Sequence, residues 1–171
     1  TNAKFLMLSH MRGHIVDMEA LLKITDEAGI KVIEDCAHTM GANWNGITSG
    51  RSGIVGCYST QTFKHINSGE GGFLITDDVE IMAKATMLSG SYMLYESHLA
   101  GAPIEAFENI RLDTPNCSGR MDNLRAAILR PQLENLSIQA KRWNKRYRKL
   151  ENGLNQVEDI SLTSRPSKEY F

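Results

Sequence analysis

The sequence lacks the features that mark membrane-spanning, disulfide-rich and nucleic-acid-binding proteins. No stretch approaches the roughly 18 consecutive apolar residues of a membrane-spanning helix. The formal net charge is −1 at pH 7, so no excess of one sign favours nucleic acid or a lipid surface as partner. The three cysteines are far apart and in no metal-binding spacing. We therefore expect a reduced, cytoplasmic protein without a metal, with 42% hydrophobic residues for a globular core.

Strand-like and helix-like segments alternate through the first half of the chain. Asp17 is placed to cap a helix that Gly29 ends, and Asp77 with Glu80 resembles a second helix start. The Gly-, Asn- and Ser-rich segment 41–53 predicts a loop. Short apolar runs predict a buried strand at residues 5–8 and further strands at 31–35, 55–60 and 73–76. This alternation predicts an α/β fold with a mainly parallel sheet flanked by helices.

The pattern changes after residue 90. Residues 91–118 show no periodicity and predict a long irregular segment, of a kind that is often functional. Helices are predicted from about residue 120, with a kink or break at Pro131, and over 138–155. The apolar residues of the first helix that we expect to face a core are Leu124, Ala127, Ile128 and Leu133.

A basic run at residues 141–149 has interleaved aromatic residues and could be mistaken for a nucleic-acid-binding patch. Its apolar members recur at helical spacing, which predicts one packed stripe with the charges on a solvated face. The stripe consists of Trp143, Tyr147, Leu150 and Leu154.

Chemically useful side chains gather between residues 35 and 72. Asp35 ends one predicted strand, Ser59 lies near the end of the next, and Lys64 follows five residues later. Ligands bind beyond the carboxyl ends of parallel strands, so these groups are expected to share a crevice near the glycine-rich turn 68–72. A carboxylate, an amine and a hydroxyl are what a pyridoxal phosphate site needs. From the spacing alone, a solvated lysine and a turn-capping aspartate remain the commoner explanation.

Several motifs occur in the order found in one enzyme family. They are His10–His14, Val16–Met18, Ile33–His38, Gly56–Ser59, Lys64 and Ser68–Gly72, followed by Arg120–Asp122, Ala126–Ile128 and Gln132–Leu133. Over roughly residues 5–136 the chain resembles the DegT/DnrJ/EryC1/StrS family of fold-type I, pyridoxal-phosphate-dependent sugar aminotransferases. The resemblance implies transfer of an amino group from glutamate or glutamine to a keto group of a nucleotide-linked sugar or cyclitol.

The resemblance also assigns roles to individual residues. It implies that Lys64 holds pyridoxal 5′-phosphate as a Schiff base and moves the proton, and that Asp35 pairs with the pyridine nitrogen. His38 takes the place beside the cofactor ring, and Ser59 binds the phosphate. His10 and His14 have no third ligand nearby, so we assign no metal to them.

The chain departs from the family pattern in places. Ile54 stands where the family usually has Asp, and Ser118, with Asn116 before it, stands where an Asn reaches the partner subunit's phosphate. The segment 91–118 is also unusual and is expected to influence substrate choice. We expect a fragment: residues 1–136 as part of the large cofactor-binding domain, and 137–171 as a linking helix and the truncated start of the small domain. The full-length protein should be a homodimer.

Three other functions remain open. A dehydratase of the same family would carry a histidine in place of Lys64, and His65 is only its neighbour. A dinucleotide-binding domain is disfavoured, because the turn 68–72 precedes a strand instead of opening a helix. A non-enzymatic regulatory relative is disfavoured by the joint presence of the residues assigned to the cofactor.

Overall fold

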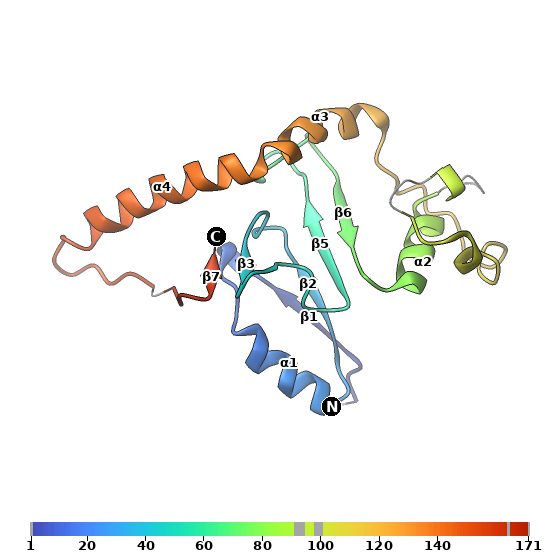
Figure 1. Ribbon diagram of the computed structural model, residues 1–171, viewed down its shortest axis with the longest axis horizontal. Coiled ribbons are helices and arrows are strands. Elements are labelled where there is room, and N and C mark those ends of the chain that lie inside the picture. Colours follow the sequence, from blue (N-terminus) through green and yellow to red (C-terminus); the bar gives the residue numbers. More distant parts are fainter. Residues whose placement is uncertain (1, 91–94, 98–100, 164, 171) are drawn as a thin grey trace.

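The computed structural model describes residues 2–90, 95–97, 101–163 and 165–170, and its centre is a four-stranded sheet (Figure 1). The strand order is β1-β2-β5-β6, with β1 at Phe5–Ser9, β2 at Lys31–Asp35, β5 at Val55–Ser59 and β6 at Gly72–Ile75. The first three strands are parallel and β6 is antiparallel to β5. The predicted α/β class and mainly parallel sheet are therefore confirmed.

Strand β1 forms one edge of this sheet, and the prediction that it is buried was wrong. Phe5 and Met7 are 61% and 72% exposed, whereas Leu8, on the other face, packs against a buried cluster that includes Met18 and Trp44. Successive side chains of a strand point to opposite faces, so one face of β1 is covered and the other is open among the described residues.

Both N-terminal helices begin at aspartate caps. Helix α1, Met18–Glu27, starts where the Asp17 side chain accepts a hydrogen bond from Ala20 N, as predicted. Helix α2, Val79–Ser89, starts at Asp78 and not at Asp77. Asp78 accepts from two backbone N–H groups of the first turn, whereas Asp77 forms an exposed ion pair with Arg51.

The segment predicted as a loop at 41–53 contains a small hairpin. Strands β3, Asn43–Trp44, and β4, Ile47–Thr48, pair antiparallel around Asn45-Gly46, both of which have positive φ. The C-terminal strand β7, Glu169–Tyr170, adds to β3 and completes a second, three-stranded sheet. The end of the chain thus returns to its first third (Figure 1).

Helices α3, Asn123–Glu134, and α4, Leu136–Leu154, follow one another along the top of the molecule (Figure 1). The break lies at Asn135, four residues after Pro131. The predicted core face of α3 was wrong, because only Leu129 is buried; it packs beside Met40, Tyr58 and Ile66. The four residues that were predicted to face a core are all exposed: Leu124, Ala127, Ile128 and Leu133.

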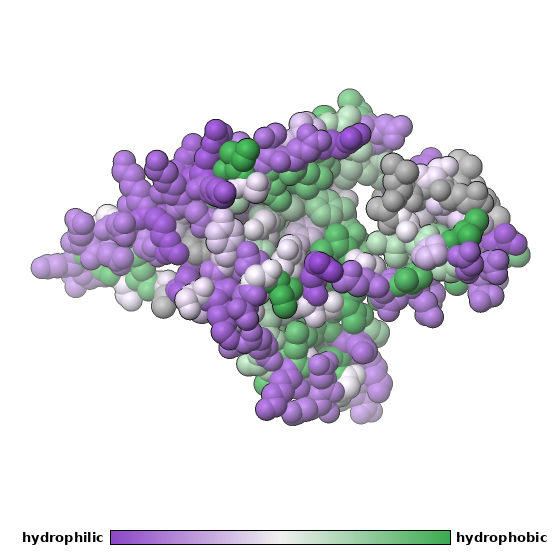
Figure 2. Space-filling model, in the orientation of Figure 1, coloured by the Kyte–Doolittle hydropathy of each residue, from purple (hydrophilic) through white to green (hydrophobic). Residues whose placement is uncertain are grey.

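The basic run lies on α4 with its charged side chains exposed, and Figure 2 shows hydrophilic residues covering this part of the surface. Trp143, Tyr147 and Leu154 are half-buried as predicted, but Leu150 is exposed. None of the helices in the described ranges combines the length and apolarity needed to cross a bilayer.

The described part of segment 91–118 is irregular, as predicted, apart from short 3₁₀ turns. These are Tyr95–Ser97 and Ile104–Phe107, and an earlier one lies at Met11–Gly13. Tyr95 and Phe107 stack at 4.4 Å and pack on Ala83 and Met87 of α2, forming a separate small core. The domain boundary at 136/137 stays a prediction.

Candidate active site

Asp35 stands at the carboxyl end of β2 as an ionised acceptor. Its two oxygens accept hydrogen bonds from the Ser9 hydroxyl at 2.9 Å and from Ala37 N at 3.0 Å. Partial burial raises the pKa of Asp35, but these two bonds and the charges of His38 and Lys64 outweigh it, so the pKa lies below its usual value. The carboxylate therefore carries a negative charge near both side chains at neutral pH.

A tightly hydrogen-bonded loop, residues 60–71, presents Lys64. Its two arms are joined by bonds from Thr60 N to Gly71 O and from Thr62 N to Gly69 O, both 2.9 Å. Gln132 of α3 fixes the far end, because its carboxamide accepts from Asn67 N at 3.0 Å and donates to Asn67 O at 2.8 Å. The lysine is thus carried by a closed loop anchored to a helix.

His38 is held through one ring nitrogen. Its Nδ1 accepts a hydrogen bond from Arg12 N at 3.0 Å, which places the proton of the neutral ring on Nε2. Arg12 has a left-handed backbone with φ 58°, and Gly13 follows with φ 79°. A Cβ on Gly13 would lie 3.1 Å from His38 O, so glycine permits this close approach.

Lys64 and His38 line one pocket of about 480 Å³ that is also bounded by α4 and by the backbone at Gly13. Apart from the Tyr147 phenol, its ionisable lining is basic or imidazole and holds no carboxylate: Arg12, His38, Lys64, His65 and Arg165. Trp143 and Tyr147 form the α4 wall, with the His65 and Trp143 rings edge to face at 5.3 Å. Such a pocket favours an anionic or electron-rich ligand with a flat face.

The remaining predicted residues lie outside this pocket. Ser59 ends β5, and its hydroxyl oxygen accepts a bond from Gln61 N at 3.3 Å. The Asn116 side chain turns back to accept from Ser118 N at 2.7 Å. No described residue of segment 91–118 lines the Lys64 pocket. The roles of Ser59, Asn116 and Ser118 remain predictions.

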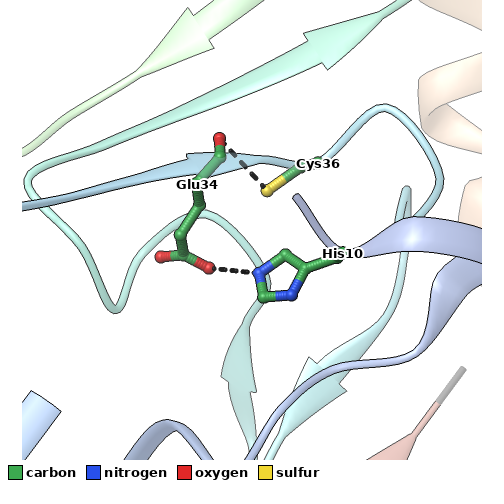
Figure 3. Close-up of side chains that lie close together, drawn as sticks. All are labelled: His10, Glu34 and Cys36. Carbon is green, nitrogen blue, oxygen red and sulfur yellow. Dashed lines mark hydrogen bonds and ion pairs between the residues drawn. The ribbon is translucent and has the colours of Figure 1, made fainter. Parts of the chain in front are cut away.

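A buried trio beneath the site resembles a metal-ligand set (Figure 3). His10, Glu34 and Cys36 have one potential ligand atom each, all within 4.8 Å of one another. The Glu34 oxygens, however, already accept from His10 Nε2 and from the backbone N–H groups of Gly50, Ser52 and Gly53. Burial raises the pKa of Cys36 to about 11, so its thiol keeps its proton. The trio is a hydrogen-bonded core that fixes the loop before β5. Its carboxylate oxygens are already engaged and its thiol is protonated, so it is a poor set of metal ligands.

Three features of the site were missed in the sequence. Ser9 was not singled out, although it is in register with Asp35 on the neighbouring strand. The backbone contact of Arg12 to His38 has no sequence signal except the following glycine. The α4 stripe was predicted to be packed, but its place beside Lys64 was not: Trp143 and Tyr147 line the same pocket as this lysine.

Comparison with known proteins supplies the decisive observation. The model of the DegT/DnrJ/EryC1/StrS aminotransferase family matches residues 1–170. The chain belongs to this family. L-glutamine:scyllo-inosose aminotransferase of Streptomyces griseus is 31% identical over 156 residues, which are 91% of this chain and 36% of that protein. The family resemblance predicted from the motifs is thereby confirmed.

Solved structures agree. DesV of S. venezuelae, in complex with a ketimine intermediate, is 27% identical with a TM-score of 0.78, over 97% of this chain and 42% of that one. A GDP-4-keto-6-deoxymannose-3-dehydratase with a trapped PLP-glutamate geminal diamine shares the fold, with 23% identity and a TM-score of 0.78. It is matched over 99% of this chain and 46% of that one. The chain therefore spans less than half the length of these relatives.

Proposed function

We propose that the protein is a pyridoxal-phosphate-dependent aminotransferase. It transfers an amino group from glutamate or glutamine to a keto group of a nucleotide-linked sugar or a cyclitol. The observation that carries the proposal is that Lys64 and His38 line one basic pocket. The charges of both side chains also help to lower the pKa of nearby Asp35 and keep it ionised. In this reading the full-length protein is a cytoplasmic homodimer that needs neither nucleic acid nor membrane.

The residues present fit pyridoxal phosphate. An ionised carboxylate suits the protonated pyridine nitrogen, and each Asp35 oxygen has a lone pair beyond its one internal bond. The Nε2 proton of His38 is available for an oxygen on the ring, because Nδ1 is already an acceptor. Ser59 offers a hydroxyl proton to the phosphate, since its oxygen acts as acceptor toward Gln61. Lys64 supplies the amine that would bind the cofactor covalently.

The proposed chemistry divides between cofactor and protein. Bound pyridoxal phosphate supplies an electron sink that stabilises negative charge on the carbon next to the reacting nitrogen. Asp35 keeps its charge near His38 and Lys64 and would thereby hold a proton on the pyridine nitrogen. Lys64 Nζ would take the proton released from the substrate carbon next to the reacting nitrogen and give it back later in the transfer. Trp143 and Tyr147 form an aromatic wall of the Lys64 pocket.

The test is the first half-reaction with the full-length protein. Incubation with pyridoxal phosphate and L-glutamine or L-glutamate should release the corresponding 2-oxo acid, in an amount that does not exceed the enzyme when no keto acceptor is present. Lys64→Ala should release none, whereas Lys84→Ala, at an exposed lysine on α2, should behave as the parent. Absence of the 2-oxo acid with both donors, although the cofactor is bound, would reject transamination and favour the dehydratase or regulatory readings.

A further inference from the structure

Residues 165–170, here called the C-terminal arm, clamp the segment that holds His38. Arg165 Nη1 donates to Gly13 O at 3.2 Å and to Glu169 Oε1 at 2.9 Å. The same Glu169 oxygen accepts from Ile15 N at 2.8 Å. The arm therefore makes two direct bonds to residues 13–15, from positions about 150 residues later in the sequence.

This clamp is buried, unlike most ion pairs of the molecule. The Arg165 and Glu169 side chains are 10% and 1% exposed, and the Tyr147 ring lies 5.5 Å from the Arg165 guanidinium. A buried ion pair is costly unless its geometry and remaining hydrogen bonds are satisfied, so the loss of one partner is strongly felt. By contrast, Lys168 in the same arm pairs with Glu19 at the surface, with both side chains about half exposed.

The clamped segment has a backbone that needs support. Two consecutive residues, Arg12 and Gly13, are left-handed, a conformation that is strained for a non-glycine residue. This conformation aims Arg12 N at His38 Nδ1. Release of Gly13 O and Ile15 N would let residue 12 return to an ordinary conformation and turn its N–H away.

We propose that Arg165 and Glu169 are positioning residues that act through the 12–15 segment on His38. They keep Arg12 N in place, Arg12 N keeps His38 Nδ1 as an acceptor, and the ring proton stays on Nε2 in the Lys64 pocket. The importance of this for catalysis rests on the proposed function, in which His38 contacts the cofactor. The link from arm to imidazole does not depend on that function.

The experiment records the ring-nitrogen NMR signals of histidine in full-length, cofactor-free protein labelled with ¹⁵N-histidine. The His38 signals are assigned by their loss in His38→Gln, and amide hydrogen exchange at residues 12 and 15 is followed by mass spectrometry. In the parent, His38 should be the Nε2–H tautomer with Nδ1 hydrogen-bonded. Glu169→Ala should bring both tautomers into exchange and speed exchange of Ile15 N–H at least tenfold.

Matched variants separate the clamp from general destabilisation. Lys168→Met removes the exposed pair in the same arm and should leave the His38 signals and Ile15 exchange unchanged. Glu169→Gln and Arg165→Lys are milder changes, because each keeps a group that can form part of the original hydrogen bonding. They replace Glu169→Ala if that variant does not fold, and they should shift the His38 signals by an intermediate amount. Unchanged His38 signals in Glu169→Ala, or in both milder variants, despite faster Ile15 exchange would overturn the proposal and leave only a structural clamp.

A cofactor readout distinguishes failure of this inference from failure of the proposed function. If both hold, Glu169→Ala should also raise the Kd of pyridoxal phosphate about tenfold, the equivalent of one neutral hydrogen bond. A changed His38 tautomer with no pyridoxal phosphate binding in any variant, parent included, would retain the positioning link and reject the aminotransferase. Normal cofactor binding with an unchanged tautomer would reject the link and retain the enzyme.

Discussion

Replacement of Glu34 by Gln should loosen the loop before β5 far more than an ordinary surface change. Glu34 is 1% exposed, and its two oxygens accept four N–H groups at 2.6–2.9 Å. A glutamine keeps one oxygen but places an NH₂ group against N–H donors on the other side. At least one buried donor then loses its acceptor, and the remaining bonds lose their charge assistance.

The magnitude follows from the burial of the carboxylate. A buried donor that loses its acceptor costs about 1–3 kcal/mol, and more where the acceptor was charged. Since 1.4 kcal/mol is a factor of ten, amide exchange at Gly50, Ser52 and Gly53 should speed by roughly five- to a hundredfold or more. Hydrogen exchange with mass spectrometry measures this locally, without requiring reversible unfolding of the full-length protein.

A matched control and a pH series make the prediction sharp. Glu151→Gln removes a partly exposed pair with Arg148 on α4, far from this loop in the sequence, and should change exchange in residues 50–53 by less than threefold. An equally small effect of Glu34→Gln would refute the reasoning. Burial alone would raise the pKa of Glu34, but its bonds to His10 and to the Gly53 and Gly50 amides lower it below 4.5. Its stabilisation is therefore present above about pH 4.5 and lost as the pH falls through the folded-state pKa, and Glu34→Gln should flatten this acid dependence.

Two further predictions concern the loop and the thiols. Gln132→Leu removes both bonds to Asn67, so proteolysis and amide exchange in residues 60–71 should increase while α4 is unaffected; an unchanged loop would show that α3 does not anchor it. Cys36, with its pKa raised to about 11 and no exposure, should resist iodoacetamide at pH 8, whereas exposed Cys117 should react. Equal labelling rates in a peptide map would contradict the buried hydrogen-bonded core.

The sequence predicted the elements whose signals are local. Asp17 as a cap, the β-branched strand at 31–35 and the order of strands and helices all depend on neighbouring residues, and all are confirmed. The hairpin at 43–48 had such a signal as well, because Asn45-Gly46 readily adopts the two positive φ values of a tight turn, and it was overlooked.

What could not be predicted depends on distant contacts. Nothing near residues 5–9 shows that β1 lies at a sheet edge with Phe5 exposed, since this depends on which strands lie beside it. For the same reason the exposed face of α3 was assigned to a core. The bond between Glu169 and Ile15 joins residues 154 positions apart, and no periodicity in either segment indicates it.

The candidate site divides along the same line. The motifs placed Asp35, His38, Ser59 and Lys64 in order along the chain, and the structure brings Lys64 and His38 into one pocket. Ser59 and Asp35 are not among the residues that line this pocket. The charges of Lys64 and His38 nevertheless lower the pKa of Asp35. That α4 forms a wall of this pocket, and that the C-terminal arm contacts residues 13–15, is visible only in the three-dimensional structure.

The most direct test of the central claim is borohydride reduction of the full-length protein after incubation with pyridoxal phosphate, followed by peptide mass mapping. The account predicts a phosphopyridoxyl group on Lys64, retained in Lys84→Ala and lost in Lys64→Ala together with the visible absorbance of the covalently bound cofactor. No adduct at Lys64, with the cofactor bound noncovalently or not at all, would contradict it.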